Sequence, residues 1–134
     1  MAVVVGYLPT KEGRAALRRA AEEAVLRKSR MVVVNSVRPG RSPEASAGDQ
    51  LDAELAEIQA RLDQAGVAYE VRHVQRNGEP SEDLISVAEE EDAGFIVIGL
   101  RRRTPVGKLI LGSNAQRILL DAPCPVLAVK AERD

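Results

Sequence analysis

Short runs of β-branched apolar residues alternate along the chain with longer stretches whose apolar residues recur at helical spacing. The short runs predict five strands: Met1–Tyr7, Met31–Val37, Tyr69–Gln75, Gly94–Gly99 and Pro125–Lys130. The longer stretches predict four helices: Thr10–Lys28, Asp49–Gln64, Pro80–Glu91 and Ser113–Leu120. Three of the strands are continuously apolar, which is typical of strands buried on both faces of a parallel sheet. Helices then cover both faces, and right-handed crossovers make the fold doubly wound.

The second predicted helix has the clearest pattern. Its apolar residues recur at spacings of four, three, four and three and form one stripe: Leu51, Leu55, Ile58, Leu62 and Ala65. Gly66 is the expected stop of this helix, and the Pro, Gly and Ser residues of Arg38–Gly48 predict a loop before it. Thr10 can cap the first helix, and Pro80 suits the first turn of the third.

The order of the elements predicts where a ligand would bind. We expect a single α/β domain over residues 1–134, with a five-stranded parallel sheet in the order 3-2-1-4-5. In that order the chain reverses direction between strands one and four, and ligands of open α/β sheets bind at such a point, outside the carboxyl ends of the strands. The two loops that flank this point are Tyr7–Thr10 and Gly99–Ser113.

Composition excludes several classes of function. The chain has 45% hydrophobic and 29% charged residues, as globular proteins do, and a formal net charge of −1. Its aromatic residues are Tyr7, Tyr69 and Phe95, too few for a platform on which nucleic-acid bases stack. No apolar run approaches the length of a membrane span, and nothing resembles a signal peptide. We therefore expect a cytoplasmic protein that binds neither nucleic acid nor membranes.

The loop after the fourth strand is long and basic. It contains Arg101, Arg102, Arg103 and Lys108, although the chain as a whole has no net positive charge. Gly112 and Ser113 then open a helix, whose unpaired N–H groups and positive dipole end favour an anion. These features predict a site for a phosphate or another polyanion. The alternative is a solvated cluster of arginines followed by a tight turn.

Two other kinds of site used in phosphate chemistry are excluded by the residues found at a few positions. A P-loop would need glycine where Arg102 stands and Ser or Thr where Leu109 stands. A receiver-type acidic pocket for Mg²⁺ would need carboxylates at the ends of strands one and three, where the chain has Leu8 and Gln75–Arg76. There is also no GxGxxG motif after the first strand.

The single histidine and the single cysteine are expected to be structural. His73 lies on the third predicted strand without a second histidine or a nearby cysteine, so it is a poor metal ligand. Cys124 lies between two prolines at the start of the last strand, and nothing in the sequence suggests a lowered thiol pKa. We therefore expect neither a metal site nor a catalytic residue.

Several segments together resemble one known family. Gly99, Arg102, Gly112 and Ser113 have the spacing of the motif Gly-x2-Gly-x9-Gly-(Ser/Thr), with Arg102 in place of the second glycine. With the opening Val3–Gly6 and the ending Ala122–Lys130, this pattern resembles universal stress proteins over nearly the whole chain. The motif is that of ATP-binding members, in which an acidic residue at the end of strand one contacts the nucleoside. Leu8 stands at that position here.

The resemblance implies a site for an adenine nucleotide, either ATP or AMP/ADP, with or without Mg²⁺. The residues expected around it are Gly6, Tyr7, Leu8, Ser36, Ile98, Gly99, Arg101, Arg102, Gly112, Ser113 and Asn114. The apolar side chain of Leu8 can pack on adenine but cannot bind a ribose hydroxyl. Arg102 can block the approach that a glycine permits or can add a charged contact to phosphate.

The leading hypothesis is thus a small regulatory module of the stress response that binds an adenine nucleotide and at most hydrolyses ATP slowly. The alternative is a nucleotide-free, dimeric interaction protein of the same fold. Apolar residues of the fifth strand form an edge that should be covered or paired: Val126, Leu127, Ala128 and Val129. We therefore expect a homodimer through this strand, unless a C-terminal tail covers it.

Overall fold

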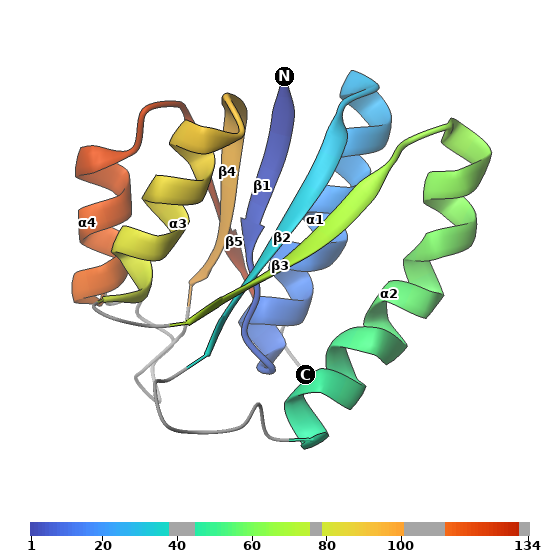
Figure 1. The fold of residues 1–134 in the computed structure, drawn as a ribbon, viewed down its shortest axis with the longest axis horizontal. Helices are drawn as coiled ribbons and strands as arrows, with labels where there is room; N and C mark the ends of the chain where they lie inside the picture. Colours follow the sequence, from blue (N-terminus) through green and yellow to red (C-terminus); the bar gives the residue numbers. More distant parts are fainter. Residues whose placement is uncertain (38–44, 76–78, 101–111, 132–134) are drawn as a thin grey trace.

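A computed structural model describes residues 1–37, 45–75, 79–100 and 112–131 of the chain. Its strands are β1 (Ala2–Gly6), β2 (Arg30–Val37), β3 (Tyr69–Gln75), β4 (Ala93–Leu100) and β5 (Val126–Lys130). They form one parallel sheet in the order β3-β2-β1-β4-β5. The predicted fold class and strand order are therefore confirmed (Figure 1).

Four helices are found in the described residues: α1 (Lys11–Arg27), α2 (Ala45–Ala65), α3 (Pro80–Glu90) and α4 (Ser113–Asp121). One predicted boundary is wrong, because α2 begins at Ala45, inside the segment Arg38–Gly48 that was expected to be a loop. The Ala-Ser-Ala sequence from Ala45 favours a helix, and a single glycine, Gly48, costs a helix only about 1 kcal/mol.

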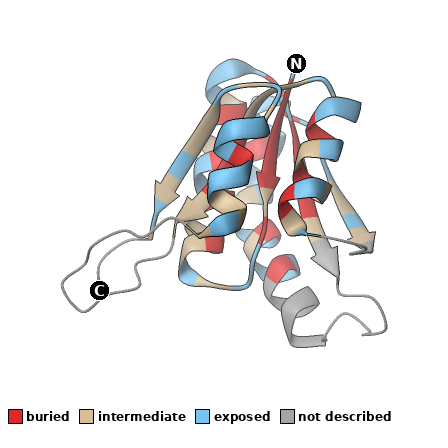
Figure 2. Cartoon of the chain, turned by 90° about the vertical axis from the view of Figure 1, so that its left-hand side faces the viewer, coloured by how far each residue is buried: buried red, intermediate tan, exposed pale blue. Residues whose placement is uncertain are grey.

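The sheet lies between two helical layers, each with its own hydrophobic core. Helices α1 and α2 cover one face, and α3 and α4 cover the other (Figure 1). Side chains of β1 alternate between the two cores: Val3 and Val5 pack toward α1 and α2, and Val4 packs toward α3. All three valines are completely buried, so the central strands appear as the buried centre of the molecule in Figure 2.

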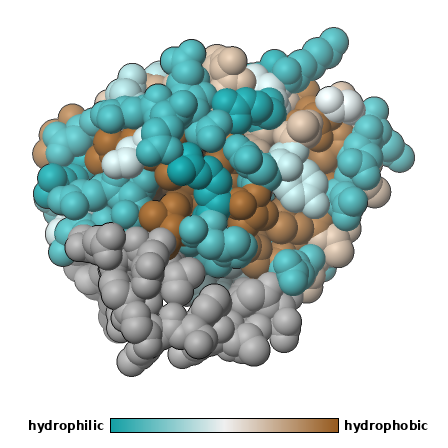
Figure 3. Space-filling view, in the orientation of Figure 1, coloured by the Kyte–Doolittle hydropathy of each residue, from teal (hydrophilic) through white to brown (hydrophobic). Residues whose placement is uncertain are grey.

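The β3 edge of the sheet carries charged side chains. At the β3 edge Arg72 pairs with Glu90 at 2.7 Å, and Arg30 pairs with Glu91 at 2.5 Å. His73 is exposed and lies 3.2 Å from the Asn35 side-chain nitrogen. The charged third strand is thus an edge strand, as expected. Hydrophobic residues are also visible in the middle of Figure 3, where Figure 1 places the sheet between α3 and α2.

The described residues bear on three further expectations. They hold no cluster of side chains suited to a metal ion. Cys124 is half-buried, and this burial raises the pKa of its thiol, which disfavours the reactive thiolate. No helix within these residues has the length and hydrophobicity needed to cross a membrane.

Candidate functional site

The carboxyl ends of β1 and β4 lie side by side in the sheet. Val5 of β1 is level with Val97 of β4, so Gly6 and Ile98 follow directly beyond this pair. From here the chain turns into α1 on one face after β1, and it continues toward α4 on the other face after β4. The structure thus brings together the two strand ends that flank the expected ligand crevice.

Gly6 ends β1 and faces α3. A Cβ atom at this position would lie 3.1 Å from Leu84 Cδ2, which is a tight contact with the end of a flexible side chain. The backbone of Gly6 is therefore approached closely by α3. A larger side chain here would have to displace Leu84 before it could reach any ligand.

Tyr7 faces the opposite core. Its side chain is buried with α1 and α2, and its backbone N–H donates to the Val34 carbonyl at 3.0 Å. The N–H of Tyr7 is thus already used and does not face the crevice as a donor. Burial raises the pKa of the Tyr7 phenol, the nearby Glu54 raises it further, and Arg14 lowers it.

Leu8 turns the chain from β1 into α1. Its side chain is 55% exposed, and its carbonyl accepts a hydrogen bond from the Thr10 N–H at 2.8 Å. The same stretch of backbone lies against Gly13, where a Cβ atom would stand 2.7 Å from the Leu8 carbonyl carbon. Gly13 therefore allows the turn to sit directly on the first turn of α1. Leu8 offers the crevice an apolar side chain and no side-chain hydrogen bond.

Thr10 fixes where α1 starts. Its backbone is extended, and its hydroxyl accepts a hydrogen bond from the Gly13 N–H at 3.1 Å. This confirms the predicted cap. Gly13 itself was not predicted as important, although a glycine in the first turn of a helix is a signal of close backbone approach.

Gly99 is explained by packing against α1. A Cβ atom at this position would lie 2.6 Å from the Glu12 carbonyl carbon and closer still to its oxygen. Only a glycine lets the first turn of α1 rest on the end of β4. The first glycine of the family motif therefore holds the two sides of the crevice together. Its neighbour Ile98 is 4% exposed and belongs to the core under α3 and α4.

The first backbone N–H groups of α4 have no hydrogen-bond partner within the helix. Gly112 is the N-cap residue, and among the described residues no side chain caps the helix there. Gly112 has a φ of −69°, so its backbone does not require glycine. Ser113 is exposed and Asn114 is half-buried. An uncapped helix start with an exposed hydroxyl suits an anionic group.

Three of the expected site residues can be placed only in part or not at all. Ser36 lies on β2, level with Val74 of β3, but its side chain is outside the described part of the structure. Arg101 and Arg102 lie outside the described residues, as does the rest of the basic loop between 101 and 111.

Buried polar atoms without hydrogen-bond partners occur on both sides of β1. Among the described residues these atoms are Tyr7 Oη, Glu54 Oε2 and Ser81 Oγ, of which Glu54 Oε2 still has an ion pair with Arg18 at 3.5 Å. Ser81 is 1% exposed in the first turn of α3, on the helix face that also carries Leu84. An unpaired buried polar group costs about 1–3 kcal/mol, so Tyr7 Oη and Ser81 Oγ mark places where water or a ligand would be stabilising. Nothing in the sequence pattern pointed to Ser81.

Comparison with known proteins identifies the family. The model of the universal stress protein family matches residues 1–130. Over 136 aligned residues the chain is 43% identical to a universal stress protein of Mycolicibacterium smegmatis, with 96% of each covered. A universal stress protein structure from Archaeoglobus fulgidus matches with a TM-score of 0.78 and 36% identity, covering 97% of this chain and 98% of that one.

Two further solved structures contain a nucleotide. The universal stress protein from Archaeoglobus fulgidus in complex with dAMP has 31% identity and a TM-score of 0.71, covering 97% of this chain and 98% of that one. A universal stress protein in complex with cAMP has 25% identity and a TM-score of 0.71, covering 98% of each chain. On the family match and the 43% identical relative, this chain belongs to the universal stress protein family.

Proposed function

We propose that this protein is a regulatory module that binds an adenine nucleotide between the carboxyl ends of β1 and β4. The observation that carries the proposal is the start of α4, where no described side chain caps the helix at Gly112 and Ser113 is exposed, next to strand ends that Gly99 holds together. The dAMP and cAMP complexes of similar proteins support the class of ligand. ATP is the nucleotide that we propose, with Mg²⁺ on its phosphates, in a cytoplasmic stress response.

Each side of the crevice has a different role in this proposal. The exposed side chain of Leu8 packs on the adenine ring, and Ser36, near the end of β2, is the residue that we propose to reach the base. The N–H groups and hydroxyl at the start of α4 receive a phosphate. Arg101 and Arg102 of the basic loop add charge to the phosphates. Because Leu8 replaces an acid, ribose hydroxyls are recognised by backbone groups or not at all.

The test is a pair of substitutions at one position. Ser113→Asp places a negative charge at the first position of α4, which favours the helix but repels a phosphate. Ser113→Asn is the matched neutral control. We expect calorimetry with ATP, ADP and AMP in Mg²⁺ to show binding that Ser113→Asp abolishes and Ser113→Asn retains. No heat at millimolar nucleotide with the unmodified protein would rule out the proposal.

A second candidate is a nucleotide-free homodimer, which the outer strand favours. In the described sheet β5 pairs with β4 alone, and its central residue Ala128 is exposed. Pairing of two β5 edges would satisfy their outward-facing backbone groups. Ala128→Glu would place like charges across a symmetric pair, whereas Ala128→Gln would not. Sedimentation should then show a dimer for the parent and for Ala128→Gln only. A monomeric parent protein would exclude this candidate.

A further inference from the structure

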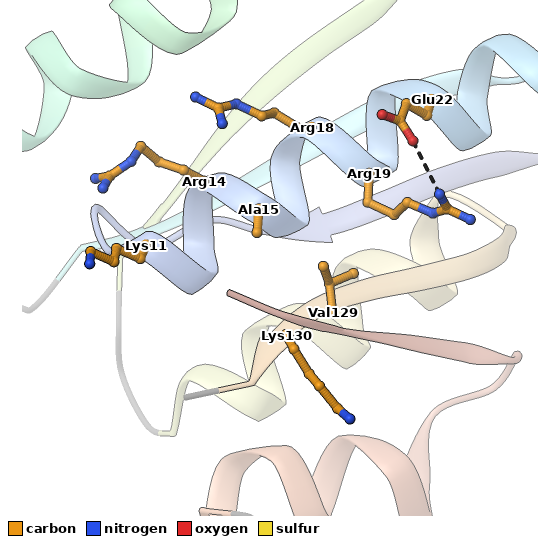
Figure 4. Close-up of a pocket in the computed structure, with 8 residues that line it drawn as sticks. All are labelled: Lys11, Arg14, Ala15, Arg18, Arg19, Glu22, Val129 and Lys130. Atoms are coloured by element: carbon orange, nitrogen blue, oxygen red, sulfur yellow. Dashed lines mark hydrogen bonds and ion pairs between the residues drawn. The ribbon is translucent and has the colours of Figure 1, made fainter. Parts of the chain in front are cut away.

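A groove runs between α1 and β5 and starts at the carboxyl edge of the sheet, where Lys11 begins α1 and Lys130 ends β5. Its volume is about 470 Å³, and eight described residues line it. Five of them are cationic: Lys11, Arg14, Arg18, Arg19 and Lys130. Glu22 is the one acid among them. Ala15 of α1 and Val129 of β5 point toward one another across the groove and give it an apolar floor (Figure 4).

Two arginines of the groove are half-exposed but pair with acids that are partly buried. Arg18 lies 3.5 Å from Glu54 and 3.8 Å from Glu57, both on α2. Arg19 lies 3.1 Å from Glu22 and 3.4 Å from Glu23 within α1. Glu54 and Glu23 are only 12% and 11% exposed, so the arginines keep these pairs when a partner binds. Because each guanidinium carries five N–H donors and about half of each arginine side chain is exposed, donors remain for carboxylates of a partner.

The dimensions of the groove match a short extended peptide. Lys11 and Glu22 are eleven residues apart on α1, or about 16 Å at 1.5 Å per residue. Roughly five residues of an extended chain span that length at 3.3 Å each. Lys11, Arg14 and Arg18 follow one another at about 4.5 and 6 Å along the helix axis. Side chains on one face of an extended peptide recur every ~6.6 Å. This spacing differs little from the spacing of the cationic residues along the helix axis, and long cationic side chains can adjust to the difference.

The lining favours a peptide over other polyanions. Proteins that bind single-stranded nucleic acid commonly stack its bases on aromatic rings, and the described lining residues include none. The apolar floor suits small aliphatic side chains between the acidic ones. Glu22 at one end disfavours any anionic group there, so the acidic residues of a bound segment are expected near Lys11 rather than at the Glu22 end.

We propose that the groove between α1 and β5 binds an extended acidic segment of a partner protein, with carboxylates at alternate positions. The segment lies on the α1 face of β5, over Val129, so it does not use the outer edge at which β5 would pair with a second copy. The described residues that line the groove include none of those proposed to bind the nucleotide. Peptide binding to the groove can therefore be tested whether or not nucleotide binds.

The test uses a fluorescein-labelled heptapeptide with aspartate at its second, fourth and sixth positions and valine between them. Fluorescence polarisation should show saturable binding that weakens as salt rises, because the contacts are exposed ion pairs. Arg19→Gln should weaken binding about two- to fivefold. Arg117→Gln on α4 is the matched control, because Arg117 is equally exposed and also has two acidic neighbours, Glu82 and Asp121. This control should bind the peptide as the parent does.

A second variant tests the floor without changing charge. Ala15→Phe fills the space between Ala15 and Val129, so binding should be lost while the thermal melt stays close to that of the parent. A peptide with the three aspartates adjacent should bind more weakly than the alternating one. The proposal is overturned by no binding of the alternating peptide at millimolar protein, by equal effects of Arg19→Gln and Arg117→Gln, or by tighter binding of a single-stranded oligonucleotide in the same groove.

Discussion

Gly99→Ala tests whether the first motif glycine serves the fold or the ligand. The new Cβ atom would lie 2.6 Å from the Glu12 carbonyl carbon, where ordinary contacts begin at 3.4 Å. The first turn of α1 and the end of β4 must therefore separate by at least about 0.8 Å, because the Glu12 carbonyl oxygen lies closer still. Overpacking of this kind costs about 1–3 kcal/mol, and the upper end applies because the obstacle is backbone. Loss of glycine's freedom in the unfolded chain returns about 0.4–1 kcal/mol.

The expected net loss of stability is therefore about 2 kcal/mol, measured by urea unfolding in the absence of nucleotide. For a chain of this size that corresponds to a fall in Tm of roughly 6–10 °C. Gly94→Ala is the matched control on the same strand. Its Cβ atom would collide with the side chain of Met1, which is 62% exposed and free to move aside. We expect Gly94→Ala to change stability by less than about 1 kcal/mol.

The reasoning would be refuted by a Gly99→Ala protein that is as stable as the parent. If that stable variant had also lost nucleotide binding, the glycine would be explained by approach of the ligand. If stability falls and a nucleotide restores it in proportion to its concentration, the crevice survives the substitution. These three outcomes separate a packing role from a binding role at one atom.

Three further substitutions test single interactions. Thr10→Ala removes the acceptor of the Gly13 N–H and should cost about 1 kcal/mol in urea unfolding, with Thr10→Ser as the control that keeps the cap. Ser81→Ala removes a buried hydroxyl without a partner and should leave stability unchanged or raise it by about 1 kcal/mol; a loss above 1 kcal/mol would show that the hydroxyl has a partner. The hydrogen bond from Arg30 lowers the pKa of Glu91 below 4.5, so its stabilisation is present above that pH and is lost as pH falls through the lowered pKa. Glu91→Gln should therefore flatten the acid limb of a plot of Tm against pH, and an unchanged limb would contradict this assignment.

Strand and helix positions were predictable because strands that are buried on both faces of the sheet are apolar at consecutive positions, unlike the helices between them. β3 begins and ends where the pattern predicts, at Tyr69 and Gln75, and α4 begins at Ser113 as expected. The start of α2 was missed because Gly48 is a local turn signal, whereas a helix tolerates one glycine when its neighbours favour helix. A single turn residue therefore does not predict a loop where its neighbours favour a helix.

The roles of residues at the site were less predictable than their positions. The pattern located the crevice at Gly6–Leu8 and Gly99 because strand order alone determines which ends meet. It could not show that Tyr7 turns its side chain into the opposite core, since one residue after a strand determines that direction. Nor could it show what rests on Gly99, because Glu12 is 87 positions away in the chain and contacts it through backbone.

The two glycine contacts separate the framework of the crevice from its specificity. The Leu8 backbone rests on Gly13, and the Glu12 backbone rests on Gly99, so the end of β1, the first turn of α1 and the end of β4 form one packed unit. Both contacts involve main-chain atoms, and the exposed side chain of Leu8 takes part in neither. The side chain at position 8 can therefore change without moving the strand ends. We expect Leu8→Asp to alter which nucleoside binds, measured as the ratio of AMP to dAMP affinity, while the urea midpoint stays within error. A shifted midpoint with an unchanged ratio would show that Leu8 supports the fold and does not select the ligand.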